Sequence, residues 1–401
     1  MKIGIVLEQR LHSGGGFQQA LNAIRQLIRI CPSWMTVEVF TTVAENAAHP
    51  SLQGVSVRYV RRGLLERLRV MVLAQSSPLT DSLVIRTRPV TKLEREMIAA
   101  QVDLAYFAGP SSYALAFRSL SYVLTVWDLC HRDHPEFPEV SENGEFVRRE
   151  NLYRHAINRS FLTLTDSEEL SRRAVRCYGT DSSRLLAMPF QPAAFFNNQN
   201  SVDLQSLSRR MGLPENYLFY PAQFWPHKNH VRIVQALALL KEQGKYYSAV
   251  FCGGEQSNKA HVKTVAEKLG VADQILFTGF VDEQDMRGLY SLSKALVMPT
   301  YFGPTNLPPL EAWGAGKPVI YSILLSEQVG DGALCVSPDS AFELAGAIER
   351  IYDDNDLQKK LVSAGYEQLK KVDALRFDAE LRLLEKLEVF NNRRACWGTV
   401  Q

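Results

Sequence analysis

The chain has 401 residues, with 45 Lys and Arg against 43 Asp and Glu and a formal net charge of +2 at pH 7. That length exceeds one ordinary hydrophobic core, so the sequence predicts two domains. A hydrophobic content of 46% with 22% charged residues excludes a disordered chain, and the near-neutral charge argues against a nucleic-acid-binding protein.

Cysteine usage and hydropathy indicate a compartment. Six cysteines are scattered without a CxxC pair, which argues against both a zinc site and a disulfide framework. Reduced thiols in a cytoplasmic protein are the simplest interpretation. No apolar run reaches the length of a membrane span, and the N-terminal run is too short for a signal peptide, so any membrane contact is expected to be peripheral.

The chain opens with a predicted strand, Lys2–Leu7, and a predicted helix, Phe17–Ile28, in which apolar residues recur at helical spacing. Gly14, Gly15 and Gly16 lie between them and allow the backbone to approach a ligand closely. The pattern is not GxGxxG, and no acidic residue follows at the dinucleotide spacing, so a Rossmann cofactor site is not expected. Two roles stay open: a loop that closes over a phosphate or a sugar, and a tight turn that needs a positive φ.

Further strands are predicted at Val37–Thr41 and Val55–Val60, and a stretch rich in Lys and Arg runs from Arg58 to Glu96. Its central piece, LLERLRVMVLA, mixes arginines with large apolar residues in the manner of an interfacial helix on an anionic membrane. A solvated face on an ordinary core helix is the other interpretation of the pattern.

Strands at Val102–Phe107 and Ser121–Val126 come next, and the second ends directly in Trp127, Asp128 and His131. Open α/β sheets bind ligands at the carboxyl ends of their strands, so these three residues are candidates for a site. Asp128 is expected to orient an acceptor or a donor hydroxyl; a capping aspartate in a loop is the alternative.

His131 and His134 have a spacing that could suggest a metal pair. Pro135 argues against a continuous helix through them, and no third ligand is evident in the sequence. The sequence therefore predicts no metal site.

A strand at Phe161–Asp166 is followed by a helix that Ser167 caps and Gly179 ends. Residues 196–214 lose periodicity and are rich in Asn, Gln and Ser. The sequence predicts that they form the interdomain linker, which places the first domain at residues 1–195.

The second domain, predicted at residues 215–372, opens with a strand at Tyr217–Tyr220 and a helix at Val231–Leu240. Lys228 lies between them, at the mouth of a strand and beside a helix N-terminus, where a lysine suits a phosphate as counter-ion. An ordinary surface lysine is the alternative. A strand at Ser248–Phe251 then leads to two glycines that are candidates to border a nucleotide, Gly253 and Gly254.

A strand at Ile275–Phe280 and a short helix at Leu289–Ala295 lead to the stretch Met298–Ile320. This stretch turns at Gly303 and Pro304 and enters a helix at Pro308, where proline costs no hydrogen bond. The amides just ahead of the helix lie at the positive end of its dipole, which suits a diphosphate. These amides belong to Thr305, Asn306 and Leu307. One turn into the helix, Glu311 is placed to accept hydrogen bonds from the vicinal hydroxyls of a ribose.

Strands at Val319–Tyr321 and Ala333–Val336, a helix from Ala341 and a terminal helix at 373–393 complete the chain. The alternation of strands and helices through both halves predicts an α/β protein with two doubly wound parallel sheets.

The stretch Met298–Ile320 resembles the donor-binding signature of the retaining glycosyltransferases of family 4, in which two glutamates flank a Gly-rich turn ahead of a helix. Glu311 matches the second glutamate, which the resemblance implies holds the ribose, and Gly303 stands in place of the first. Lys228 matches a lysine that holds the donor diphosphate in the family. Gln223 stands where the family has an arginine with the same role, and brings no charge.

The resemblance extends to the first half. Trp127 stands where the family has a histidine that faces the donor sugar, and Gly15 and Gly16 match a loop that borders donor and acceptor. The resemblance implies the GT-B fold, with two Rossmann-like domains, an interdomain cleft, and the helix at 373–393 crossing back to the first domain.

The function implied is that of a retaining, metal-independent hexosyltransferase without a cofactor. It would move a sugar from GDP-mannose or a UDP-sugar to a saccharide acceptor, carried on a polyprenyl lipid, in the synthesis of bacterial surface polysaccharide such as O-antigen. The expected location is the cytoplasm, at the inner face of the cytoplasmic membrane. Because three polar positions of the family are replaced, a catalytically inactive nucleotide-sugar-binding subunit stays open, as does an epimerase or hydrolase of the same fold.

The predicted site has three groups. The catalytic group is Asp128, Lys228 and Glu311. The acceptor side is Trp127 and His131. The donor-binding group is Gly15, Gly16, Gln223, Lys228, Gly253, Gly254, Thr305, Asn306, Leu307 and Glu311.

Overall fold

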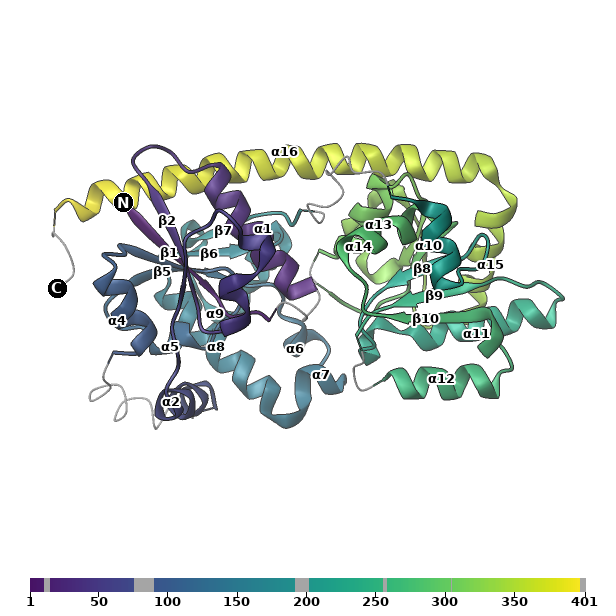
Figure 1. Ribbon diagram of the computed structural model, residues 1–401, viewed down its shortest axis with the longest axis horizontal. Helices are drawn as coiled ribbons and strands as arrows, with labels where there is room; N and C mark the ends of the chain where they lie inside the picture. Colours follow the sequence, from purple (N-terminus) through teal and green to yellow (C-terminus); the bar gives the residue numbers. More distant parts are fainter. Residues whose placement is uncertain (11–14, 76–89, 192–201, 255–257, 304, 397–401) are drawn as a thin grey trace. The chain divides into compact units, whose positions relative to one another are not determined.

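A computed structural model describes residues 1–10, 15–75, 90–191, 202–254, 258–303 and 305–396. The chain divides into two compact units (Figure 1): the first is Met1–Phe190 with Leu375–Gln401, and the second is Gln191–Ala374. Four predicted features lie wholly or partly outside the described residues. They are Gly14, Pro304, residues 196–201 of the linker and residues 76–89 of the basic stretch.

The first unit is built on a parallel sheet of seven strands in the order β3-β2-β1-β4-β5-β6-β7 (Figure 1). The strands are β1 (Lys2–Leu7), β2 (Thr36–Thr41), β3 (Val57–Tyr59), β4 (Leu104–Phe107), β5 (Ser121–Thr125), β6 (Leu162–Thr165) and β7 (Leu185–Ala187). Its helices are α1 (Gly15–Arg29), α2 (Leu64–Gln75), α4 (Lys92–Ala99), α5 (Tyr113–Ala116), α6 (Cys130–Asp133), α7 (Pro138–Ser141), α8 (Glu145–Arg159) and α9 (Glu168–Tyr178).

Apolar side chains lie on both faces of this sheet, because successive residues of a strand point to opposite faces. Ile5 of β1 packs in one apolar cluster with Leu21 of α1. Val6, the next residue, packs in another cluster with Met97 of α4. The unbroken apolar run of each strand is thus explained by burial on two sides.

The second unit is built on a parallel sheet of six strands in the order β10-β9-β8-β11-β12-β13. The strands are β8 (Leu218–Pro221), β9 (Ala249–Cys252), β10 (Ile275–Gly279), β11 (Ala295–Met298), β12 (Val319–Ser322) and β13 (Ala333–Val336). Its helices are α10 (Leu204–Met211), α11 (His230–Glu242), α12 (Lys259–Lys268), α13 (Glu283–Leu292), α14 (Leu307–Gly314) and α15 (Ala341–Asp353).

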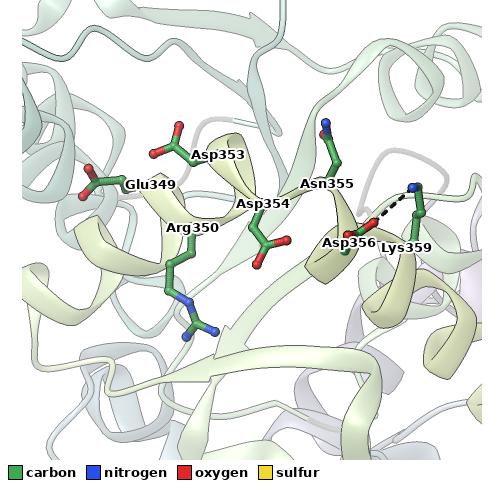
Figure 2. A pocket seen from close by; sticks show the side chains of 7 residues that line it. All are labelled: Glu349, Arg350, Asp353, Asp354, Asn355, Asp356 and Lys359. Carbon is green, nitrogen blue, oxygen red and sulfur yellow. Dashed lines mark hydrogen bonds and ion pairs between the residues drawn. The ribbon is translucent and has the colours of Figure 1, made fainter.

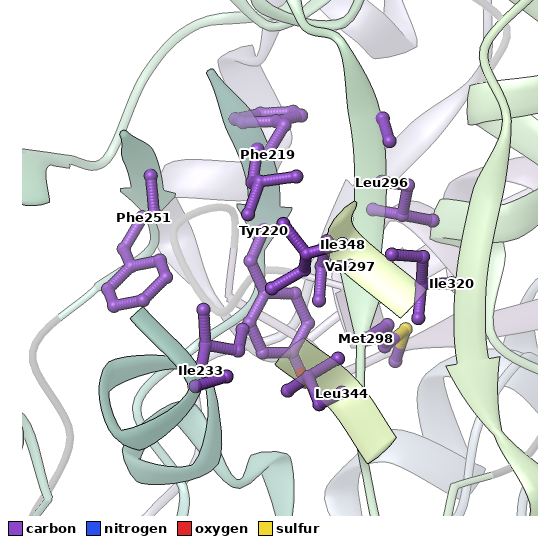
Figure 3. Packing of buried hydrophobic residues seen from close by; sticks show 14 of the residues in the cluster. Phe219, Tyr220, Ile233, Phe251, Leu296, Val297, Met298, Ile320, Leu344 and Ile348 are labelled. Carbon is purple, nitrogen blue, oxygen red and sulfur yellow. The ribbon is translucent and has the colours of Figure 1, made fainter. Parts of the chain in front are cut away.

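One apolar cluster fills the interior of the second unit (Figure 3). Tyr220 of β8 and Met298 of β11 meet side chains of two helices there, Ile233 of α11 and Leu344 of α15. Apolar burial of this kind is the main favourable contribution to folding, and it holds the ends of the strands at defined positions.

The last helix, α16, runs from Asn355 to Arg394, whereas the sequence predicts a start at residue 373. Asp354 precedes it and accepts a hydrogen bond from the amide of Leu357 at 2.8 Å, a local cap that the sequence analysis missed. Leu361 is buried in the core of the second unit, and Leu383 is buried in the core of the first. The helix therefore contributes apolar side chains to each unit in turn.

Two other predictions near helix ends are wrong. The predicted short helix Leu289–Ala295 is instead the end of α13 followed by the start of β11, because Asp282 caps a helix that begins at Glu283. The predicted linker, residues 196–214, contains α10, which Asp203 caps at its N-terminus.

A matched pair of glycines tests the packing of the second unit. A Cβ on Gly365 of α16 would overlap the indole of Trp313, while a Cβ on Gly346 of α15 would meet no atom within 4 Å. We predict that Gly365→Ala lowers the free energy of unfolding by about 1–3 kcal/mol through overpacking. Gly346→Ala should raise it by about 0.5–1 kcal/mol, since alanine favours helices. Chemical denaturation measures both, and equal effects would contradict this account.

Candidate functional site

The strand order of the second sheet reverses between β8 and β11, and two polar residues meet at that point. Lys228 ends a short 3-10 turn, Pro226–Lys228, that follows β8. Asn306 lies in the loop that follows β11, directly before α14. The Lys228 Nζ donates a hydrogen bond to the Asn306 Oδ1 at 3.2 Å. The strand ends at a reversal of chain order are where open α/β sheets bind ligands.

The side chain of Asn306 faces Lys228 for a reason that is local to the sequence. Asn306 is the N-cap residue of α14, yet its side chain makes no capping hydrogen bond. Such a cap needs an amide hydrogen two or three residues on, and Pro308 and Pro309 have none. The Asn306 Nδ2 donates instead to the Tyr321 hydroxyl at 2.6 Å.

Gly303 is the residue that stands in place of the first glutamate of the signature. A Cβ built on Gly303 would lie 2.7 Å from the Asn306 Oδ1. A glutamate here would therefore require Asn306 to move away from Lys228. The neutral amide of Asn306, 8% exposed, occupies the space beside the position where the family has a carboxylate.

The loops after β8 and β11 are also tied together by backbone and ring contacts. The His227 carbonyl accepts hydrogen bonds from the Thr300 Oγ1 at 3.1 Å and from the Tyr301 amide at 2.9 Å. The His227 ring stacks on Phe302 with their centroids 4.1 Å apart. These contacts position Lys228 relative to the start of α14.

Glu311 is 7% exposed, and its Oε2 accepts a hydrogen bond from the Tyr290 hydroxyl at 2.7 Å. Burial, followed by the charge of Glu311, raises the pKa of Tyr290, so this hydroxyl stays protonated and donates. From the sequence, Glu311 is expected to accept hydrogen bonds from the vicinal hydroxyls of a ribose. In the structure, the hydrogen bond from Tyr290 to the Glu311 Oε2 orients the carboxylate.

Gln223 follows β8, and its Oε1 accepts a hydrogen bond from the Trp225 indole at 2.9 Å. That bond orients the amide of Gln223. A Cβ on Gly253 would overlap the carbonyl of Ala222, so this glycine is required for packing against the backbone beside Gln223. A Cβ on Gly254 would meet nothing within 4 Å, which leaves that position open for a ligand.

In the first unit, Trp127 lies against two glycine backbones. A Cβ on Gly16, near the start of α1, would lie 3.1 Å from the indole, and a Cβ on Gly109 would lie 2.7 Å from it. Gly15 is the first residue of α1. The glycines therefore make room for an indole where the family has a smaller histidine ring.

Asp128 forms hydrogen bonds with its own loop and with α8. Its Oδ1 accepts a hydrogen bond from the Cys130 amide at 3.0 Å and from the Arg149 guanidinium at 2.9 Å. Both side chains of this ion pair are about one-fifth exposed. This geometry is that of the capping aspartate considered above as the alternative.

His131 was predicted on the acceptor side, and the structure places it in the interior. Its ring has no exposed surface and packs against Phe146 and Tyr153. Burial lowers the pKa of His131, although Glu150 partly opposes the shift. The enclosed ring packs between α8 and the segment that follows β5. The burial arises because α8 packs over this segment, which strand and turn patterns do not reveal.

A hollow of about 870 Å³ lies at the junction of α15 and α16 (Figure 2). None of the predicted site residues lines it. An ion pair between Lys359 and Asp356 spans 3.1 Å at its edge. The lining residues are Glu349, Arg350, Asp353, Asp354, Asn355, Asp356 and Lys359. Within the described parts of the chain, no group of three or more His, Cys, Asp or Glu side chains is arranged to hold a metal ion.

The bridge between Lys228 and Asn306 lies in a segment that matches a known protein family. Residues 208–368 match the family Glycosyl transferases group 1. The matched residues lie wholly within the second unit, and they include Lys228, Asn306 and Glu311. The matched segment therefore contains this entire network.

The chain resembles O-antigen mannosyltransferases in sequence. It is 27% identical over 173 residues to the serotype-specific mannosyltransferase WbdA of Escherichia coli, covering 42% of this chain and 21% of that protein. It is 25% identical over 202 residues to the O-antigen chain mannosyltransferase RfbU of Salmonella typhimurium, covering 50% of this chain and 53% of that protein. These matches span from about a fifth to about half of the relatives' own length.

A solved structure, HepE of Anabaena in complex with UDP-glucose, aligns with a TM-score of 0.72 and 17% identity. The alignment covers 96% of this chain and 100% of that chain. Identity at this level shows the fold alone. Together with the order of strands in the two parallel sheets, it confirms the predicted GT-B fold, with two Rossmann-like domains.

Local sequence patterns do not reveal the residues that hold the predicted ones in place. Tyr290, Tyr321 and Gln328 bind Glu311 and Asn306 directly or through one another, and the Tyr321 hydroxyl donates to the Gln328 Oε1 at 2.8 Å. The one available signal was a tyrosine in an otherwise apolar strand, since a buried hydroxyl needs a polar partner.

The ion pair of Asp128 provides a test of its role in the loop. We predict that Asp128→Asn lowers the free energy of unfolding by about 1 kcal/mol, because Arg149 loses a charged partner at a partly buried site. The matched control is Glu169→Gln, which weakens two exposed pairs, with Arg172 and Arg176, and should cost less than about 0.5 kcal/mol. Urea denaturation measures both, and equal losses in the free energy of unfolding would contradict the structural role of Asp128.

Proposed function

We propose that this protein is a glycosyltransferase that moves a sugar from a nucleotide-sugar donor to a saccharide acceptor in the synthesis of surface polysaccharide such as O-antigen. The single observation that carries the proposal is the bridge between Lys228 and Asn306 at the reversal of strand order, beside the N-terminus of α14. A lysine and a helix N-terminus at one crevice suit a diphosphate. The similarity to the two O-antigen mannosyltransferases supports the same activity.

In the proposed reaction, an acceptor hydroxyl oxygen forms a bond to the anomeric carbon of the sugar and gives up its proton, while the bond between that carbon and the diphosphate breaks. Negative charge builds on the leaving diphosphate. Lys228 offsets this charge, as do the amides of Thr305, Asn306 and Leu307 ahead of α14. A phosphate would bind the Lys228 ammonium beside Asn306. The lysine can donate three hydrogen bonds, so it can keep the amide as a partner while it binds the phosphate.

Glu311 is proposed to hold the ribose of the donor, with Tyr290 fixing one of its oxygens. Gln223 is proposed to donate a neutral hydrogen bond from its amide. Retention of anomeric configuration, by attack from the face that the diphosphate leaves, is part of the proposal, as is independence from a metal ion. The donor is proposed to be GDP-mannose or a UDP-sugar, since relatives are mannosyltransferases and HepE binds UDP-glucose.

A nucleotide-sugar-binding subunit without turnover is the second candidate. The observation that favours it is the missing carboxylate at Gly303, whose place beside Lys228 is taken by a neutral amide. The transferase and the subunit both bind the donor, but the transferase alone consumes it. Donor consumption is therefore followed with and without an acceptor. Consumption that depends on acceptor supports the transferase. Consumption without acceptor indicates a hydrolase or an epimerase, and binding alone indicates the subunit.

Lys228→Ala tests the diphosphate site. We predict that it weakens binding of UDP or GDP by at least about tenfold and lowers donor turnover further, because the charge that it offsets grows in the transition state. The control is Lys241→Ala, at the far end of α11, where the Nζ binds the carbonyl of Gly270 and lies near Asp273. Calorimetric titration with both nucleotides makes the comparison. If Lys228→Ala and Lys241→Ala bind the nucleotides with equal affinity and turn over the donor at equal rates, this placement of the diphosphate is wrong.

The acceptor is proposed to be carried on a lipid, with α2 of the first unit resting on an anionic membrane. Five apolar side chains of the helix are exposed on one face, with Leu64 at 72% and Leu65 at 77%. The others are Leu68, Met71 and Val72. Exposed Arg61 and Arg67 lie beside them in the chain and complement an anionic surface. No helix in the described part of the chain is long and apolar enough to span a bilayer.

Vesicle sedimentation tests this contact. We predict that Leu65→Glu together with Arg67→Glu reduces pelleting with phosphatidylglycerol vesicles by about tenfold or more, since each arginine near an anionic surface contributes about 1 kcal/mol. The control is Phe342→Glu on α15, a residue that is also 77% exposed. High salt should weaken binding of the parent, because a Debye length of about 8 Å leaves only near-surface charges effective. Equal pelleting of all proteins, or none, would refute the membrane contact.

A further inference from the structure

Asn229, the residue after Lys228, has a left-handed backbone conformation, with φ 58° and ψ 37°. Asparagine adopts this region more readily than residues with bulky or branched side chains. The short turn Pro226–Lys228 ends at Asn229, and α11 begins at the next residue. A left-handed residue between two right-handed turns redirects the chain, so the conformation of Asn229 determines where the turn that carries Lys228 lies relative to α11.

The side chain of Asn229 joins two other loops at the same edge of the second sheet. Its Nδ2 donates hydrogen bonds to the Pro299 carbonyl at 3.0 Å, after β11, and to the Pro338 carbonyl at 2.8 Å, after β13. An amide nitrogen has two hydrogens to donate, so these two carbonyls use both of them. Asn229 is 8% exposed, and the loss of a buried hydrogen bond costs more than the loss of one in water.

These bonds connect the two ends of the bridge described above. Lys228 precedes Asn229 in the chain, and its Nζ donates to the Asn306 Oδ1 at 3.2 Å. Asn306 lies in the loop after β11, the same loop whose Pro299 carbonyl accepts from Asn229. Asn229 therefore holds the turn that carries the lysine against the loop that carries its partner.

The main chain of Lys228 is fixed by a second buried group. The Tyr220 hydroxyl, from β8, donates to the Lys228 carbonyl at 2.8 Å. Burial raises the pKa of Tyr220, so this hydroxyl stays protonated and keeps donating. The Lys228 amide donates to the Trp225 carbonyl at 3.0 Å. With both main-chain groups bonded, the freedom of Lys228 is confined to its four-carbon side chain.

Few residue types supply what position 229 requires. Glycine adopts the left-handed conformation but has no amide side chain. Aspartate tolerates the conformation, but its carboxylate would face two carbonyl oxygens and could donate to neither. Asparagine combines a tolerated backbone conformation with two donors on one atom, so the residue type fits its two roles.

We propose that Asn229 is a positioning residue of the diphosphate site: with Tyr220, it holds the turn that places the Lys228 ammonium where it meets the phosphate. The inference rests on the proposed function and deepens it by naming what places the cation. Asn229 acts through Lys228 and does not touch the donor. A cation that is already in place stabilises the charge of the leaving group without a reorganisation of the site.

A double-mutant cycle with UDP and GDP as probes tests this role by calorimetric titration. Asn229→Gly removes the side chain and keeps the left-handed backbone. We expect it to lower the affinity for both nucleotides by about fivefold, because the ammonium is no longer held in place. In a Lys228→Ala background the same change should alter the affinity by less than about twofold, since a residue that acts through Lys228 has nothing left to position.

The matched control is Asn216→Gly. Asn216 also has a left-handed conformation, with φ 53°, but it is exposed and lies ahead of β8, at the other end of that strand. Its replacement should leave nucleotide affinity unchanged. If Asn229→Gly does not fold, Tyr220→Phe decides, because it removes one hydroxyl from the same turn and should lower the affinity by about threefold. Asn229→Gly with the affinity of Asn216→Gly, or with an equal effect in the presence and absence of Lys228, overturns the proposal.

Hydrogen exchange on the protein without nucleotide separates this inference from the proposed function. The Lys228 and Tyr301 amides donate to the Trp225 and His227 carbonyls, within the turn and between the two loops. Asn229→Gly should speed exchange of both amides by about tenfold or more, because the loops open more often. Unchanged exchange overturns the inference whether or not the parent binds nucleotides. Absence of nucleotide binding in the parent refutes the proposed function, and the exchange result alone then decides whether Asn229 holds the turn.

Discussion

The reversal of strand order between β8 and β11 is the constraint on which the candidate site depends. Loops that leave two such strands run in opposite directions from the edge of the sheet, so they bind one ligand together only if something holds them side by side. Here the hydrogen bond between Lys228 and Asn306 joins the two loops, and the stacked rings of His227 and Phe302 add an apolar contact between them. Burial of β8 and β11 in one apolar core places the loops within reach of each other.

The residues around this bridge constrain one another. Two prolines at the start of α14 remove the amide hydrogens that would have capped Asn306, so its side chain turns to Lys228 and Tyr321. The turned amide fills the space beside Gly303, and a larger residue there would collide with it. The departure from the glutamate of the signature is therefore one element of a consistent local arrangement, in which a neutral amide holds a lysine that the family pairs with phosphate.

The two sheets use the same topological feature with opposite chemistry. Each has one reversal of strand order, and each bridges it with a hydrogen bond between a charged residue and a neutral one. The charged residue is Lys228 in the second unit and Glu8 in the first. The backbone arrangement at the two reversals is thus shared, whereas the charged side chains there have opposite sign.

The sequence by itself determined the two doubly wound sheets, because buried strands and amphipathic helices have different apolar periods that can be read locally. It also made Lys228 and Glu311 candidates for the site, since their spacing from a strand end and a helix start is local. It missed α10 and the early start of α16, where single capping aspartates were overlooked. Only the tertiary structure decided the burial of His131 and the partners of the site residues. Those contacts join residues far apart in the chain, and they depend on strand order, register and helix packing that no local pattern encodes.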